Sequence, residues 1–224
     1  SYSGQNNIFY SIWGYRPVTS PDVELETLMK NPTDAGVFET NDYRFNPVLS
    51  LQNEYRKYYT DNLRINGHAE YEFIKGLKLK ISGGYTYYKT GTEVFDNSNT
   101  RRGYYGAFGA NGSTQTNEKL TWLNENILSY QGDINKTHFF SALAGITFQN
   151  SDYKTSSYGT VGVPNEFLGI SDIENGEINS KTYDISSWSM LSYLARFNYS
   201  YKSRYYITVS FRADGSSKFS RKNR

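Results

Sequence analysis

Residues 62–73 read NLRINGHAEYEF, and their side chains alternate between apolar and polar along the chain. The odd positions carry Leu63, Ile65, Gly67, Ala69, Tyr71 and Phe73. The even positions carry Asn62, Arg64, Asn66, His68, Glu70 and Glu72. Successive side chains of a β-strand point to opposite faces of a sheet, so a period of two separates these two sets. The stretch therefore predicts a strand with one apolar face and one polar face.

The alternation resumes after a short break at residues 74–76, which predicts a β-hairpin over residues 62–88. A second hairpin of equal clarity is predicted over residues 186–214, with its break at residues 202–204. Leu194 is the one departure from its alternation. A third and less regular hairpin is predicted over residues 118–149, around the turn signal at residues 132–136. Three such hairpins predict an all-β, antiparallel architecture.

The predicted strands are long, and the connections between them alternate in length. Twelve residues at ~3.3 Å each reach ~40 Å, whereas a globular strand usually has ~5–6 residues and a membrane-spanning strand needs ~9–11. The breaks within hairpins are short, and those between hairpins are long and rich in Gly, Ser, Asn and Thr. Tyr and Trp gather near strand ends, as in interfacial aromatic belts. This pattern predicts a transmembrane β-barrel segment, with short turns at one end and long external loops at the other.

Composition narrows the class further. The formal net charge is +2, so the charge balance gives no reason to expect a nucleic-acid partner. Cys is absent, which excludes disulfides, thiolate metal sites and a cysteine nucleophile. No apolar run approaches the ~18 residues of a transmembrane helix. We expect residues 62–224 to hold the barrel hairpins, and residues 1–61 to hold a barrel strand and a Pro-containing loop.

Residues 192–224 read SYLARFNYSYKSRYYITVSFRADGSSKFSRKNR and resemble a long pattern of SusC/RagA-type TonB-dependent outer-membrane transporters. The matching positions are Arg196, Asn198, Tyr199, Arg204, Tyr205, Thr208, Arg212 and residues 214–219. Stretches at residues 46–48, 76–80 and 122–125 also resemble the family's barrel. The resemblance extends over roughly residues 46–224, and more weakly over the residues before them.

The resemblance implies a place in the wall of a ~22-stranded barrel, which in this family is closed by an N-terminal plug. Such transporters import large nutrients, glycans or peptides, across the outer membrane of Gram-negative bacteria. A SusD-like surface lipoprotein acts as their outer lid, and TonB supplies energy by pulling on an N-terminal segment. This sequence is expected to lack the plug domain and to be an internal fragment of the barrel. We therefore expect contact with outer-membrane lipid, and no transport by the isolated chain, because an open sheet leaves unpaired edges that lipid does not tolerate.

Glycine recurs at every third position from Gly103 to Gly112, within residues 101–112. The spacing matches neither a P-loop nor a dinucleotide-binding fingerprint. One hypothesis is an outward loop whose aromatic side chains stack on sugar rings or on peptide side chains of the substrate. These aromatics are Tyr104, Tyr105 and Phe108. The alternative, which we favour, is that they pack locally.

The remaining motifs predict no chemistry. Resemblance assigns a structural role to Arg212, Asp214, Gly215, Ser216, Ser217 and Phe219, and a tight turn at the strand end accounts for the Asp and Gly. Residues 172–177, DIENGE, are similar to a calcium loop, but Gly stands fifth where an EF-hand needs it sixth, so solvated carboxylates are favoured. Each of the two His residues lacks a second imidazole at ligand spacing. No catalytic residue, cofactor or metal site is predicted.

Two other classes stay open beside the transporter. The first is a complete small outer-membrane barrel of ~8–10 strands with an adhesive or structural role. The second is a soluble all-β glycan-binding module, which would bury the apolar faces in a sandwich core. An enzyme is the least supported class, because no nucleophile elbow or triad is present.

Overall fold

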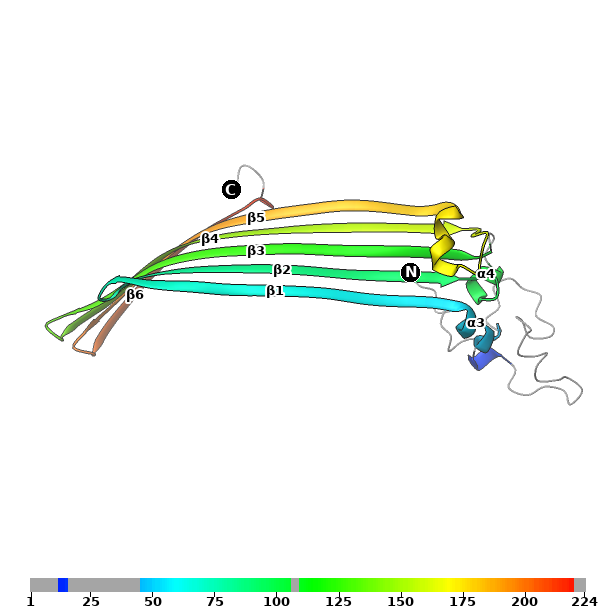
Figure 1. The fold of residues 1–224 in the computed structure, drawn as a ribbon. Coiled ribbons are helices and arrows are strands. Elements are labelled where there is room, and N and C mark those ends of the chain that lie inside the picture. Colours follow the sequence, from blue (N-terminus) through cyan, green and yellow to red (C-terminus); the bar gives the residue numbers. More distant parts are fainter. Residues whose placement is uncertain (1–11, 16–44, 106–108, 220–224) are drawn as a thin grey trace, which may run out of the picture. The chain divides into compact units, whose positions relative to one another are not determined.

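The computed structural model describes residues 12–15, 45–105 and 109–219, most of which form one antiparallel sheet (Figure 1). The strands are β1 (Glu54–Ile74), β2 (Leu77–Asp96), β3 (Asn111–Ile134), β4 (His138–Val161), β5 (Glu177–Tyr201) and β6 (Tyr205–Ser216). Their order in the sheet is their order in the chain, so each strand is hydrogen-bonded to its neighbours in sequence. This succession of hairpins confirms the predicted antiparallel, all-β fold.

The strands run further than the alternation predicted. β1 to β5 have 20 to 25 residues each, about twice the ~9–11 that cross a membrane. The added residues are largely polar at odd and even positions alike, as in residues 111–117, NGSTQTN. Because neither face of such a segment is apolar, it carries no signal of period two.

The short connections are tight turns of two or three residues. In the turn between β5 and β6, the Arg204 N–H donates to the Tyr201 carbonyl at 3.0 Å. The two residues between them, Lys202 and Ser203, have φ of 48° and 54°. Positive φ at both central positions is the geometry of a type I′ turn, whose twist matches that of the flanking strands. The turn between β3 and β4 repeats this arrangement at Asn135 and Lys136, with φ of 54° and 53°.

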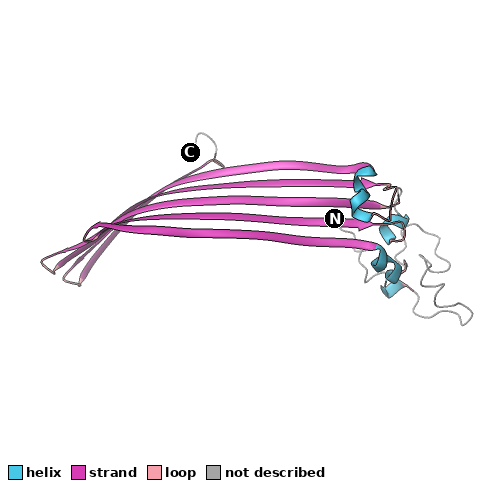
Figure 2. Cartoon of the chain, in the orientation of Figure 1, coloured by secondary structure: helices cyan, strands magenta, loops and turns pink. Residues whose placement is uncertain are grey.

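Short helices lie beside the other strand ends (Figure 2). They are α3 (Pro47–Asn53), α4 (Arg101–Tyr105) and the 3₁₀ helix η2 (Gly169–Asn175). Asn46 caps α3, because its Oδ1 accepts the N–H groups of Val48 and Leu49 at 3.0 and 3.2 Å. Among the described residues, no helix is long and apolar enough to cross a membrane.

The strand and loop expected over residues 1–61 correspond only in part to the described residues. Residues 47–53 form α3 and β1 begins at Glu54, whereas residues 12–14 are helical. An apolar run without alternation does not distinguish a helix from a strand, which explains the difference at residues 12–14. Residues 1–11 and 16–44, which include most of the Pro-containing loop, lie outside the described part of the chain.

The chain divides into two compact units, which are described separately. The loop-end unit comprises the described parts of Ser1–Tyr59, Thr90–Thr116 and Thr155–Tyr183. Its core is a cluster of Phe95, Ala110, Val163 and Ile173 with Tyr158 and Ile170 packed against it. The turn-end unit comprises the described parts of Thr60–Lys89, Asn117–Lys154 and Asp184–Arg224. All the buried hydrophobic side chains in the described part of the chain belong to the loop-end unit.

Candidate functional site

In the loop-end unit, buried polar contacts anchor the connections between strands. Asp96, at the end of β2, is fully buried, and its Oδ1 accepts a hydrogen bond from Arg56 Nη2 at 2.5 Å. The other Arg56 terminal nitrogen donates to the Phe95 carbonyl at 3.0 Å. Arg102 Nη1 lies 3.6 Å from Asp96 Oδ2, so the first turn of α4 is held beside the same carboxylate. The Arg56 and Asp96 pair thus fixes the start of β1 against the end of β2.

A second anchor joins the loop after β2 to the loop after β4. Glu166 Oε2 accepts both the Ser98 N–H at 2.9 Å and the Ser98 hydroxyl at 2.8 Å. The nearby Thr100 hydroxyl accepts the Gly103 N–H at 3.0 Å and so begins α4. These bonds set the position of α4, which carries two of the three aromatic residues for which local packing was favoured over stacking on cargo.

The predicted aromatic loop is only partly described. Tyr104 and Tyr105 lie at the end of α4, and Phe108 lies outside the described residues. The Tyr104 side chain is about half exposed, and its ring centroid lies 5.8 Å from that of Phe45, tilted by 52°. Phe45 itself is fully buried. Tyr104 therefore packs locally on one side and offers its other side to solvent, so both hypotheses for this residue are compatible with its surroundings.

The segment similar to a calcium loop, residues 172–177, covers the end of η2 and the first residue of β5. Asp172 is buried, and its two carboxylate oxygens accept the Asn165 N–H at 3.1 Å and the Asn175 side-chain amide at 2.7 Å. Within the described ranges, no three His, Cys, Asp or Glu side chains gather as a metal site would require. The Asp172 side chain serves the loop's own hydrogen bonding.

The C-terminal motif lies in the last strand and the turn that follows it. Asp214 and Gly215 are still paired strand residues, opposite Ser192 and Leu191, so the expected turn at this point is wrong. The turn comes later, where the Ser217 N–H donates to the Ser189 carbonyl at 2.9 Å and the Phe219 N–H to the Ser216 carbonyl at 3.1 Å. β5 extends far enough to pair with these residues, and the ladder therefore continues through Ser216.

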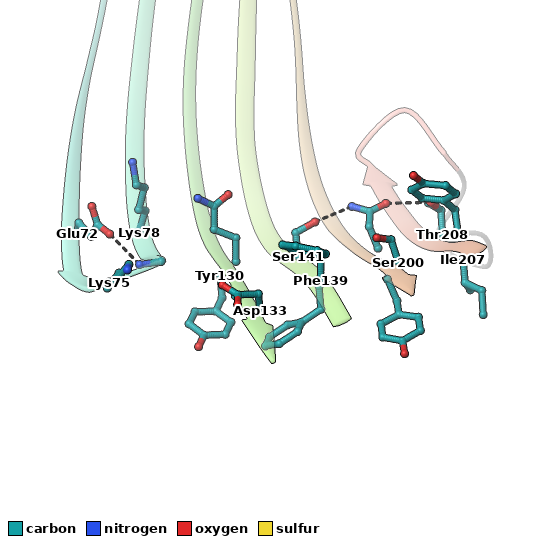
Figure 3. Close-up of a pocket in the computed structure, with 17 residues that line it drawn as sticks. Glu72, Lys75, Lys78, Tyr130, Asp133, Phe139, Ser141, Ser200, Ile207 and Thr208 are labelled. Carbon is teal, nitrogen blue, oxygen red and sulfur yellow. Dashed lines mark hydrogen bonds between the residues drawn. The ribbon is translucent and has the colours of Figure 1, made fainter. Parts of the chain in front are cut away.

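The polar faces of β4, β5 and β6 are joined by side-chain hydrogen bonds in the turn-end unit (Figure 3). The Asn198 amide donates to Ser141 Oγ at 3.0 Å, and its oxygen accepts from Thr208 Oγ1 at 3.0 Å. On the same face, Arg196 Nε donates to Ser210 Oγ at 3.2 Å, and Arg212 Nε donates to both oxygens of Asp214 at 2.9 and 3.0 Å. The residues of this face were predicted as polar by alternation, but their cross-strand partners required the register of the sheet.

A cavity of about 930 Å³ follows the short-turn end of the sheet. It is lined by residues of all six strands and the first turn, among them Glu72, Lys75, Lys78, Asp133, Phe139, Ser141, Asn198, Ser200 and Thr208 (Figure 3). Its charged side chains balance, with two carboxylates and two ammonium groups. Glu72 Oε1 accepts the Gly76 N–H at 2.8 Å, and Lys78 Nζ lies 3.1 Å from Glu70 Oε1. Such a surface can form many hydrogen bonds with a ligand without favouring a positively or a negatively charged one.

The comparisons with known proteins agree with this architecture. No protein-family model matches the chain. The TonB-dependent receptor P26 of Formosa agariphila is 35% identical over 118 residues, which are 52% of this chain and 12% of that receptor. The TonB-dependent receptor P39 of the same organism is 28% identical over 156 residues, 69% of this chain and 15% of that receptor.

A solved structure of the RagAB peptide transporter matches the fold with a TM-score of 0.71 at 22% identity, and covers 80% of this chain and 20% of that one. The RagAB peptide importer in its open-open state matches with a TM-score of 0.69 at 22% identity, over 78% of this chain and 19% of that one. This chain therefore spans about an eighth to a fifth of the proteins it matches. The resemblance to TonB-dependent receptors that was inferred from residues 192–224 is confirmed, and the fold is that of a β-barrel segment.

Proposed function

We propose that this chain forms part of the barrel wall of a SusC-like TonB-dependent transporter, which imports oligosaccharides or peptides across the outer membrane of a Gram-negative bacterium. The observation that carries the proposal is the sequence similarity to TonB-dependent receptors, 35% over 118 residues in one case. The six consecutive antiparallel strands support it, because a barrel wall is built from strands in chain order.

In this proposal the two faces of the sheet have different partners. The apolar face, which includes Leu63, Ile65 and Val209, contacts outer-membrane lipid, and all three side chains are more than half exposed in the described structure. The polar face, with the Asn198 hydrogen-bonded ladder and the 930 Å³ cavity, lines the lumen, where a plug domain and passing substrate form hydrogen bonds with it.

The mechanism is non-catalytic. Cargo is captured at the loop end with the help of a SusD-like surface lipoprotein, and TonB then remodels the plug through parts of the transporter that lie outside this chain. Tyr104, Tyr105 and Phe108 are proposed to stack on the cargo, and the residues of the C-terminal motif, Arg212 to Phe219, are proposed to shape the wall. Aromatic faces stack well on sugar rings and on peptide side chains, which suits either cargo.

Membrane fractionation combined with an uptake assay tests this proposal. The protein that contains this chain should fractionate with the outer membrane, and cells that lack its gene, or that lack TonB, should lose uptake of one oligosaccharide or peptide class. A soluble location would contradict the proposal and favour a binding module. An outer-membrane location with uptake independent of TonB would favour a small barrel or an adhesin.

A further inference from the structure

The loop-end unit contains a second cavity, of about 170 Å³, whose lining is mostly polar. Its lining residues come from β2, α4, β3, β4 and β5: Val94, Arg102, Asn111, Gly112, Ser113, Gly159, Thr160, Val161, Asn179 and Ser180. At ~30 Å³ per water molecule, the space has room for about five waters, or for one small charged group and the atoms beside it.

Glycine keeps this cavity open at Gly159. A Cβ placed at Gly159 would lie 2.6 Å from Ser180 Oγ and 3.6 Å from Ser113 Cβ, so these three positions share one face of the sheet. The atom that would be crowded is a rotatable hydroxyl, so a methyl group at Gly159 would occupy part of the cavity without displacing the backbone. The Thr160 side chain points to the opposite face of the sheet, toward Gly176, so its hydroxyl does not join the donors on the Gly159 face.

Arg102 is the one charged side chain among the described residues that line the cavity. Its side chain is about half exposed, and its Nη1 lies 3.6 Å from Asp96 Oδ2, beyond ordinary hydrogen-bond distance. Asp96 has a closer partner in Arg56, at 2.5 Å, and Arg56 is also 3.5 Å from Glu54. The Arg102 guanidinium, which has five N–H donors, is therefore oriented by Asp96 while most of its donors stay available.

We propose that this cavity is a cargo subsite that binds a carboxylate group through Arg102, with Asn111, Ser113 and Ser180 as neutral donors around it. A guanidinium binds a planar carboxylate in a bidentate manner, and amide and hydroxyl donors complete the shell of the same oxygens. This assignment rests on the proposed transport function and refines it, because two cargo classes carry such a group. An acidic oligosaccharide offers a uronate, and a peptide offers its C-terminus.

Isothermal titration calorimetry on the detergent-purified receptor that contains this chain tests the subsite with two matched pairs of probes. The first pair is a tetragalacturonate and its fully methyl-esterified form, and the second is a tripeptide with a free C-terminus and its C-terminal amide. In one pair the free carboxylate should bind at least about tenfold more tightly than the masked form, since charge-assisted hydrogen bonds are the strong ones. The pair that shows this preference identifies the source of the carboxylate.

Arg102→Gln should abolish the preference, and Gly159→Ala should weaken binding of the carboxylate probe, because the added methyl group crowds the Ser180 hydroxyl and narrows the cavity. Lys57→Gln is the matched control. Like Arg102, Lys57 is about half exposed and lies 3.6 Å from a carboxylate oxygen, here that of Glu93, but Lys57 does not line the cavity. The assignment is overturned if no carboxylate probe binds, if masked and free forms bind equally, or if Lys57→Gln has the effect of Arg102→Gln. Uptake that depends on the receptor but not on Arg102 would refute the subsite alone, whereas uptake without the receptor would refute the proposed function.

Discussion

The loop-end unit and the turn-end unit share strands β1 to β5, yet among the described residues only the loop-end unit buries large apolar side chains in a core. The loop-end unit buries Phe95, Ala110, Val163 and Ile173 in a core of its own. In the turn-end unit, large apolar side chains such as Phe211 and Ile65 are more than half exposed. The loop-end unit is stabilised by its own hydrophobic core. The turn-end unit requires an apolar solvent for its exposed side chains, which we propose is lipid. The same secondary structure is thus adapted to two environments in β1 to β5.

The largest effect on stability is expected from truncating Phe95, a side chain of the loop-end core. Phe95→Ala should lower the local free energy of unfolding by about 3–5 kcal/mol, because it deletes a buried ring and leaves a cavity. Hydrogen exchange of the receptor should accelerate at residues 155–183 and stay unchanged in the turn-end unit. Phe211→Ala, at an exposed site, is the control and should leave exchange in the loop-end unit unaltered. If Phe95→Ala and Phe211→Ala accelerated hydrogen exchange in the loop-end unit equally, the two units would not differ as described.

A charge on the exposed apolar face tests the opposite environment. Ile65→Arg should destabilise β1 in lipid vesicles by about 2–4 kcal/mol, the cost of Arg on a lipid-facing strand. His68→Arg places the same side chain on the polar face of the same strand and should cost less than about 1 kcal/mol. The urea concentration that unfolds the receptor in vesicles measures both. Indistinguishable midpoints would contradict the assignment of the two faces.

The same contrast explains how much could be predicted from the sequence. Residues 62–88 and 186–214 alternate because one face is apolar and the other polar, and this signal was sufficient to predict their hairpins. Residues 111–117 lack the alternation, so the loop-end extension of β3 was not predicted. The Asp96, Arg56 and Arg102 cluster joins residues far apart in sequence, and local patterns carry no signal for such contacts. A single Gly such as Gly159, which is buried in the structure, gave no indication of a cavity either.

A smaller effect is expected from the bond that joins two loops of the loop-end unit. Glu166→Ala removes the acceptor of both the Ser98 N–H and the Ser98 hydroxyl, and should cost about 1–3 kcal/mol of local stability. Limited proteolysis should then cut faster at residues 97–105. Glu174→Ala, at an exposed position of the connection between β4 and β5, should leave the cutting rate unchanged. Unaltered proteolysis in Glu166→Ala would mean that the apolar core alone holds these loops.

The smallest effect is expected at a turn of the turn-end unit, where no apolar core contributes. Ser203 has φ of 54°, a left-handed conformation that costs a non-glycine residue ~1–2 kcal/mol, whereas glycine loses ~0.5–1 kcal/mol more conformational entropy on folding. The net expectation for Ser203→Gly is a gain of about 0.5–1 kcal/mol, seen as slower hydrogen exchange of the Arg204 amide, which donates to the Tyr201 carbonyl. Ser200→Gly, within β5 of the same hairpin, should instead lose about 0.5–1 kcal/mol, because glycine weakens a strand interior. If both variants accelerated exchange, the turn would not carry backbone strain, and the hairpin would be limited by its strands.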